Sequence, residues 1–327
     1  MRLNIKKRSL QLFLPLLLTH STAFAVALEF KGEPAVAYEK GYSEAYTGTD
    51  KQYYYDTEER EIAYSHKLSE IPYVNGLKHG VAKYWQYQGR PKSMHTYEQG
   101  VLNGEAKTWY PQSNTLIWQR HYTAGKENGT SRYWFSNGAL QWQMHMKNGL
   151  RDGLVEEWNK QKQRVYSGEF QQGKQVGTHL WLYDNGNKSV EADFVDGKYH
   201  GSYQAWEKNG VKVIQAQYVN GQKQGEELRW YKNGQLQSQR SYQAGLKQGK
   251  EQLWYRDGKP MLTANYQAGL KHGQQQTWYA SGEKQSSSYY QADAVTGKEL
   301  LWTKAGDESS FEYKNGRVVG FDLPTLE

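Results

Sequence analysis

Histidines and acidic residues are the side chains of this sequence that could support metal binding or proton transfer. His79, His200 and His272 each stand three residues after a recurring glycine, but they lie 121 and 72 residues apart in the chain. Five equivalent positions hold another polar residue: Asn103, Asn128, Asp152, Gln224 and Gln248. A metal site needs several converging ligands, so we interpret this position as a polar turn residue.

The other candidates for catalysis are weaker. Glu156-Glu157 and Glu226-Glu227 are adjacent pairs, and neighbours along a strand point to opposite faces, so we read them as solvated strand charge. The chain has no cysteine, which excludes disulfides, thiolate metal ligands and a cysteine nucleophile. Its Gly-x-x-x-Gly segments lack the Gly-Lys-Ser/Thr ending of a phosphate-binding loop. We therefore predict no catalytic residue, no metal, no cofactor and no enzymatic activity.

The dominant feature is a repeat of about 24 residues. In each unit an aromatic residue, or Met146 in one unit, precedes a glycine by three positions, from Tyr73 to Tyr266. A second glycine follows four residues later, where we expect backbone conformations closed to residues with a Cβ: Gly80, Gly104, Gly129, Gly153, Gly177, Gly201, Gly225, Gly249 and Gly273. Such a period is typical of a repeat architecture and not of a single globular core.

The pattern within one unit predicts a β-hairpin. Residues 226–231 suit one strand, residues 236–242 suit a second, and Asn233-Gly234 between them predicts a type I′ turn with positive φ at both residues. An isolated hairpin is marginal in water, so neighbouring units must stabilise each other. The predicted fold class is all-β: an elongated, open-ended antiparallel β-sheet built from tandem hairpins of about 24 residues.

Two aromatic rows follow from this arrangement. A tryptophan stands nine residues after the first glycine in eight units, and we expect these indoles to stack between repeats: Trp85, Trp109, Trp134, Trp158, Trp206, Trp230, Trp254 and Trp278. The next residue in several units is Tyr or Phe, whose side chain should point to the opposite face. Exposed aromatic rows mark binding sites, so we predict a binding surface at Tyr110, Phe135, Tyr231, Tyr255 and Tyr279.

The first 25 residues have the pattern of an export signal. Four basic residues precede an apolar stretch at residues 10–18, and Ala23-Phe24-Ala25 follows. Nine residues are too few to span a bilayer, which takes about 20. We predict Sec export with cleavage after Ala25, or after Ala27 as a second possible site. The mature protein would lie in the periplasm, in the cell envelope or outside the cell.

Charge argues against nucleic acid as a partner. Without the four basic residues of the signal, the chain has 37 basic and 34 acidic residues, a formal charge of +3. Binding to phosphates requires clustered Lys and Arg, so we predict no nucleic-acid binding.

The sequence divides into four segments, since a repeat array needs capped ends. Residues 1–25 form the signal peptide, and residues 26–75 a degenerate N-terminal repeat or cap, with Tyr54-Tyr55 in place of Trp-Tyr. Residues 76–292 hold nine repeats. Residues 293–327 form a degenerate repeat and C-terminal cap, where Asp293 replaces the first glycine.

The segments at residues 75–80, 244–249 and 268–273 resemble the core of the MORN (membrane occupation and recognition nexus) repeat. The Trp-Tyr and Asn-Gly pairs that follow are similar to the bacterial variant, found in proteins described as YwqK-family antitoxins. The resemblance covers about residues 73–316. It implies an elongated antiparallel sheet that contacts proteins or lipids, without catalytic residues. Eukaryotic repeats have a further glycine where this chain has Ala82, Ala106, Ser131 and Tyr203, so their membrane-tethering role is not expected here.

The sequence thus predicts an exported, non-enzymatic scaffold that binds a protein partner along its sheet. Two alternatives stay open. One is an antitoxin or immunity-like protein of a toxin–antitoxin system. The other is binding to a glycan, to cell wall or to a membrane surface through the aromatic rows.

Overall fold

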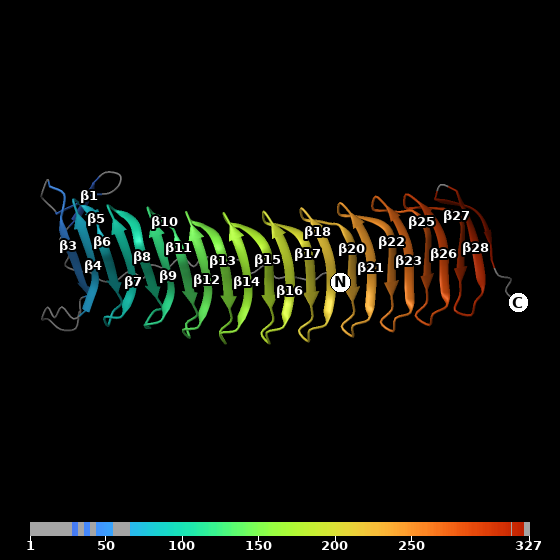
Figure 1. Ribbon diagram of the computed structural model, residues 1–327, viewed down its shortest axis with the longest axis horizontal. Coiled ribbons are helices and arrows are strands. Elements are labelled where there is room, and N and C mark those ends of the chain that lie inside the picture. Colours follow the sequence, from blue (N-terminus) through green and yellow to red (C-terminus); the bar gives the residue numbers. More distant parts are fainter. Residues whose placement is uncertain (1–27, 32–35, 40–43, 55–65, 315, 324–327) are drawn as a thin grey trace. The chain divides into compact units, whose positions relative to one another are not determined.

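The computed structural model describes residues 28–31, 36–39, 44–54, 66–314 and 316–323 (Figure 1). The chain divides into two compact units, residues 1–101 with 111–114 and residues 102–110 with 115–327. The described residues contain β-strands and no helix, and hence no helix long and apolar enough to cross a bilayer. The predicted signal peptide and its cleavage site at Ala25 lie outside the described residues.

The first unit contains a strand pair and an antiparallel sheet. The pair is β1 (Leu28–Lys31) with β2 (Val36–Glu39). The sheet comprises β3 (Gly48–Tyr54), β4 (His66–Val74), β5 (Leu77–Lys78), β6 (Gly80–Trp85) and β7 (Pro91–Glu98). The pairing of β3 with β4 lies where the sequence predicts a degenerate repeat, and Tyr55 is outside the described residues.

The second unit continues the same up-and-down order. Its strands are β8 (Val101–Trp109, whose first residue belongs to the first unit), β9 (Leu116–Thr123), β10 (Lys126–Glu127), β11 (Gly129–Trp134), β12 (Leu140–Lys147), β13 (Leu150–Trp158), β14 (Arg164–Gln171), β15 (Lys174–Leu182), β16 (Lys188–Val195), β17 (Lys198–Trp206), β18 (Lys212–Val219), β19 (Gln222–Lys223), β20 (Gly225–Trp230), β21 (Leu236–Gln243), β22 (Leu246–Trp254), β23 (Pro260–Gln267), β24 (Leu270–Lys271), β25 (Gly273–Trp278), β26 (Lys284–Gln291), β27 (Ala294–Trp302), β28 (Glu308–Lys314) and β29 (Arg317–Asp322). Neighbouring strands pair antiparallel, from β8 with β9 to β28 with β29, and the two-residue strands β10, β19 and β24 pair with the same strands as β11, β20 and β25 that follow them. Among the described residues of this unit, no pairing joins β29 back to β8, so its sheet is open. The predicted all-β fold of tandem hairpins is confirmed.

The hairpin loops differ from our prediction of type I′ turns. Gly234 has a φ of +84°, but Asn233 does not have a positive φ. The Gly234 N–H donates to the Tyr231 carbonyl at 2.9 Å, and the Tyr231 N–H donates to the Gln235 carbonyl at 2.8 Å. This is a three-residue loop closed by a glycine. The type I′ geometry lies at the other end of the strands, at pairs such as Asn220 (φ 50°) and Gly221 (φ 84°).

The asparagine of the hairpin loop has a different role from the predicted one. The Asn233 side chain accepts a hydrogen bond from the Gln235 N–H at 3.2 Å and donates one to the Arg256 carbonyl of the next repeat at 3.1 Å. Asn137 and Asn185 bond to loop carbonyls of their next repeats in the same way. Asparagine therefore ties one loop to the next, whereas the glycine supplies the backbone conformation.

The buried side chains of the second unit gather on one face of its sheet. We call this the lined face. It carries the position two residues after the second glycine, together with the aromatic residue that precedes the first glycine on the neighbouring strand. The former position is held by Ala106, Ser131, Val155, His179, Tyr203, Glu227, Glu251, Gln275 and Glu299. Its members range from alanine to glutamate, and most are buried, so the lined face differs in chemistry from repeat to repeat.

Candidate binding face

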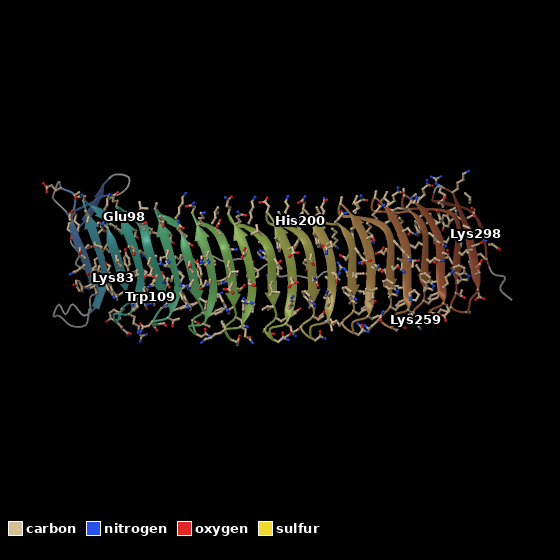
Figure 2. The ribbon with its side chains drawn as sticks, viewed as in Figure 1. Lys83, Glu98, Trp109, His200, Lys259 and Lys298 are labelled. Atoms are coloured by element: carbon tan, nitrogen blue, oxygen red, sulfur yellow. The ribbon has the colours of Figure 1, made fainter. Side chains whose placement is uncertain are left out.

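The tight-turn edge of the strands is built from backbone and short polar side chains. All nine predicted turn glycines have positive φ, for example +116° at Gly153, where an added Cβ would lie 3.2 Å from the Cβ of His145. In several repeats the side chain before this glycine accepts a hydrogen bond from the next turn, as His200 Nδ1 does from the Asn220 N–H at 3.4 Å. Figure 2 shows His200 at this edge and Lys259 at the opposite, hairpin-loop edge. The histidines thus occupy the polar turn position that we expected.

The predicted binding residues Tyr110, Phe135, Tyr231, Tyr255 and Tyr279 follow directly after strands, at the start of hairpin loops, and are half-buried. Each tyrosine of this set donates a hydrogen bond to the carbonyl of the tryptophan one repeat later: Tyr110 to Trp134, Tyr231 to Trp254, Tyr255 to Trp278 and Tyr279 to Trp302, at 2.8–2.9 Å. Tyr183 bonds to Trp206 in the same way. This row has an inter-repeat role that the sequence did not indicate, and its role in binding stays a prediction.

The eight tryptophans of the predicted stacking row are half-buried. Trp206 is flanked by lysines from both neighbouring strands, with Lys188 Nζ 5.4 Å and Lys212 Nζ 5.8 Å from its ring centroid. Such cation–π contacts cover an indole face with the lysine stem. Stacking between the indoles themselves remains a prediction.

A second aromatic row, on the lined face, was missed from the sequence. Backbone pairing places its members opposite one another on adjacent strands from β9 to β15. Directly opposed residues of antiparallel strands share a face, and the strands lie about 4.8 Å apart. The row consists of Trp118, Tyr133, Trp142, Glu157, Tyr166 and Trp181. A signal existed in the sequence, because Trp118, Trp142 and Tyr166 stand four residues before Tyr122, Met146 and Phe170, the residues that precede the first glycine, and so share their face.

His179 packs among the aromatic rings at the β14–β15 end of this row. It is fully buried, and its ring lies 5.3 Å from Phe170 and 4.8 Å from Phe194, measured between centroids. Its Nε2 donates to the Glu169 carbonyl at 2.9 Å, so its Nδ1 accepts from the Tyr166 hydroxyl at 2.6 Å. Burial lowers the pKa of His179 below its usual value, against the opposing effect of the Glu169 carbonyl. The imidazole is therefore neutral and fixed in one tautomer.

The lined face is hollowed beside His179. A shallow depression of about 340 Å³ is lined by Trp142, Arg151, Glu157, Tyr166, Phe170, Gln175 and Trp181. The Arg151 guanidinium lies 5.2 Å from the Phe170 ring centroid. Burial raises the pKa of Tyr166 to about 12, which keeps its hydroxyl neutral. The depression thus combines aromatic rings with one basic, one acidic and one amide side chain.

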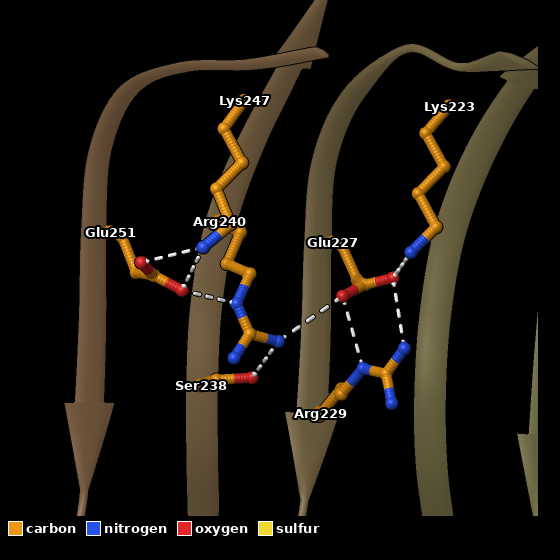
Figure 3. Close-up of polar contacts among 7 residues, drawn as sticks. All are labelled: Lys223, Glu227, Arg229, Ser238, Arg240, Lys247 and Glu251. Carbon is orange, nitrogen blue, oxygen red and sulfur yellow. Dashed lines mark hydrogen bonds and ion pairs between the residues drawn. The ribbon is translucent and has the colours of Figure 1, made fainter. Parts of the chain in front are cut away.

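Further along the lined face the aromatic row gives way to charge (Figure 3). Glu227 on β20 is 1% exposed. It accepts hydrogen bonds from Lys223 and from Arg229, whose Nε lies 3.0 Å away, and pairs with Arg240 Nη1 at 3.4 Å. Glu251 on β22 is paired with Arg240 and with Lys247, whose Nζ lies 2.8 Å away. Arg240 therefore bridges the two carboxylates. We call this set, with Ser238, the charged cluster.

The charged cluster corrects our reading of Glu226-Glu227 as solvated strand charge. The two side chains do point to opposite faces, and Glu226 is exposed, but Glu227 is buried. Burial raises the pKa of Glu227, and the hydrogen bonds from Arg229 and Lys223 outweigh this effect, so the net pKa is lowered. The pKa of Glu251 is also lowered, because hydrogen bonds from Lys247 and Arg240 outweigh the effect of burial. Both carboxylates are ionised and act as fixed anchors for the surrounding bases.

Among the residues that the structure describes, no three His, Asp or Glu side chains gather as a metal site would need. A family model described as MORN repeat variant matches residues 223–244 and 247–268. These two segments are MORN variant repeats. All seven residues of the charged cluster lie within the two matched MORN segments, whereas the aromatic depression lies in repeats outside them.

No curated protein matches the chain. Among solved structures, the chain is similar to a crystal structure of TcdB2-TccC3, with 10% identity over 88% of this chain and 21% of that chain, at a TM-score of 0.18. A crystal structure of TcdB2-TccC3-Cdc42 gives 8% identity over 92% of this chain and 21% of that chain, at a TM-score of 0.17. The chain thus spans about a fifth of the length of either protein.

Proposed function

We propose that this protein is an exported, non-enzymatic repeat scaffold that binds a protein partner on the lined face of its second unit. MORN variant repeats and an open sheet of tandem hairpins support a scaffold. Repeat architectures of this kind present extended surfaces on which binding groups recur at fixed spacing. The partner-binding part of the proposal rests on the charged cluster.

The charged cluster fits an acidic segment of a partner. It has four basic and two acidic side chains, a net charge of +2. The two carboxylates are buried, whereas the side chains of Arg229 and Lys247 are 39% and 31% exposed. Two of the five N–H donors of Arg229 bond to Glu227, and a partner carboxylate could accept from the others. Complementary charge of this kind steers association and selects partners.

A pair of double variants tests the partner site. Arg229→Gln/Lys247→Gln removes the excess charge of the cluster. Lys208→Gln/Lys232→Gln removes the same charge from exposed hairpin-loop lysines of the same region and is the matched control. Tagged mature protein, crosslinked mildly in envelope extracts, should retain a stoichiometric polypeptide, and the cluster variant should retain about tenfold less, which corresponds to about 1.4 kcal/mol. Failure to capture a polypeptide, or equal loss in both double variants, would refute the site.

Export is the second part of the proposal, supported by the basic residues, apolar stretch and small-residue pattern of residues 1–25. Mass spectrometry of the protein from envelope fractions should find a mature N-terminus at Val26. Ala25→Asp should cause the precursor to accumulate, because signal cleavage requires a small residue there. Full-length protein confined to the cytosolic fraction would count against export.

A further inference from the structure

We propose that the aromatic depression binds a flat, β-1,4-linked oligosaccharide, a ligand distinct from the protein partner. The depression lies on β12 to β15, away from the charged cluster on β19 to β22. The two sites differ in chemistry, since one is built around aromatic rings and the other around ion pairs. They can therefore be tested separately.

Aromatic rings in register suit the apolar faces of sugars. Trp142, Tyr166 and Trp181 lie in one cross-strand row, and the Tyr166 and Trp181 ring centroids are 5.2 Å apart. A pyranose ring offers a face of C–H groups that packs on an aromatic ring, with its hydroxyls around the rim. A β-1,4-linked chain is extended and flat, so its successive rings can follow a row of side chains across neighbouring strands, which are about 4.8 Å apart.

The polar side chains that line the depression fit sugar hydroxyls better than a lipid tail, an apolar peptide or a simple ion. Arg151 supplies donors, Glu157 supplies acceptors and Gln175 supplies both. Hydroxyls donate and accept, so one sugar can satisfy all three. A lipid tail or apolar peptide would replace water around the charged side chains and offer no hydrogen bonds in return, which is costly. Glu157 would repel an anion, and Arg151 would repel a cation.

The floor of the depression is organised before any ligand arrives. Tyr166 and Phe170 are buried, and the hydrogen bonds of His179 to Tyr166 and to the Glu169 carbonyl hold the floor on two sides. A ligand therefore orders few side chains on binding, which reduces the entropic cost. The row continues beyond the depression through Tyr133 and Trp118, so a chain longer than the depression would find further rings.

Calorimetric titration of the mature protein tests the proposal with three hexasaccharides. Cellohexaose and chitohexaose share the flat β-1,4 backbone and differ in their N-acetyl groups, whereas maltohexaose is coiled. We expect binding of at least one β-1,4 ligand and about tenfold weaker binding of maltohexaose. Trp142→Ala and Trp181→Ala should each weaken the β-1,4 ligand by about tenfold or more, as is usual for a central aromatic contact.

The repeats supply matched controls for the titration. Leu262 and Leu253 occupy the positions of Trp142 and Trp181 in a later hairpin, so Leu262→Ala and Leu253→Ala should leave binding within about twofold. If the tryptophan variants unfold, Glu157→Gln and Gln175→Ala provide the test, with losses of about threefold or more expected from the hydrogen bonds. Arg229→Gln/Lys247→Gln should bind saccharide normally even if it loses the protein partner.

Three results would overturn the site. The first is no heat from any hexasaccharide at millimolar concentration. The second is unchanged affinity in folded Trp142→Ala and Trp181→Ala proteins, or unchanged affinity in the two polar variants if the tryptophan variants unfold. The third is a loss in the leucine controls equal to that in the tryptophan variants.

Discussion

Replacing Gly168 with alanine tests how rigidly His179 is held. A Cβ at residue 168 would lie 2.2 Å from His179 Nδ1 and 2.6 Å from its Cγ and Cε1. The imidazole is fully buried, and both of its nitrogens are hydrogen-bonded. The ring therefore cannot give way without losing the bond to Tyr166 or the bond to the Glu169 carbonyl.

The cost follows from two effects. Overpacking a well-packed site costs about 1–3 kcal/mol, and leaving a buried polar group without its partner costs about 1–3 kcal/mol more. We expect Gly168→Ala to lower the free energy of unfolding by about 2–6 kcal/mol. The neighbouring Ser167→Ala, which changes a side chain on the other face, should stay within about 0.5 kcal/mol.

A second substitution should rescue the first. In a later hairpin, Ala264 and Gln275 occupy the positions of Gly168 and His179, and both are buried. Gly168→Ala/His179→Gln copies that pair, so we expect the double variant to be more stable than the sum of the single changes predicts, by about 0.5–3 kcal/mol. Urea unfolding monitored by tryptophan fluorescence, together with hydrogen exchange in β14 and β15, measures the cost of Gly168→Ala and its coupling with His179→Gln. A single variant as stable as the parent, or strictly additive effects, would refute the reasoning.

Three further predictions concern stability. Glu227→Gln leaves Lys223, Arg229 and Arg240 around an uncharged side chain, so urea unfolding at neutral pH should show a loss of about 3 kcal/mol; a change no larger than that of exposed Glu226→Gln, expected below about 0.5 kcal/mol, would contradict this. Because the pKa of His179 lies below the value of 6.5 that applies in the unfolded chain, the unfolded chain takes up a proton first as pH falls. Stability should therefore drop below about pH 6.5 by up to about 1.4 kcal/mol per pH unit until the folded-state pKa is reached. His179→Gln should reduce this slope between pH 7 and 5, with the part due to half-buried His95 remaining, whereas exposed His272→Gln should leave it intact. Tyr255→Phe removes the hydrogen bond to the Trp278 carbonyl and should cost about 1 kcal/mol, measured by thermal unfolding; no change at all would mean that the tyrosine row does not join the repeats energetically.

The array of tandem hairpins could be predicted from the sequence because its pattern recurs in every unit. Glycines with positive φ, alternating strand residues and Asn-Gly loops recur with the same period, so each unit supports the interpretation of the next. The loops were placed correctly, but their conformation was not. We predicted a positive φ at Asn233, but its φ is not positive, and its side chain donates a hydrogen bond to the Arg256 carbonyl of the next repeat. That partner cannot be identified until the two loops are known to lie side by side.

The lined face was harder to predict for two physical reasons. Its contacts join residues on different strands, such as Arg240 with Glu251 and Tyr166 with His179, so they depend on register. That register shifts within each repeat, for example between Arg240 and Tyr242. A simple alternation rule fails at such a shift. The burial of Glu227 could not be read from the sequence either, because the three bases around it come from both its own and the neighbouring strand.

The bonds that run from tyrosine to tryptophan carbonyl, and from loop asparagine to loop carbonyl, each connect one hairpin only to the adjacent hairpin. None of them involves the residue two positions after the second glycine. These bonds are thus independent of the side chain at that position, which can be alanine or glutamate, or histidine where the facing strand has a glycine, as with Gly168 and His179. A 24-residue module could be exchanged for its neighbour, with Gly168 moved together with His179, which would move a recognition patch by one step along the sheet and leave the surrounding architecture in place.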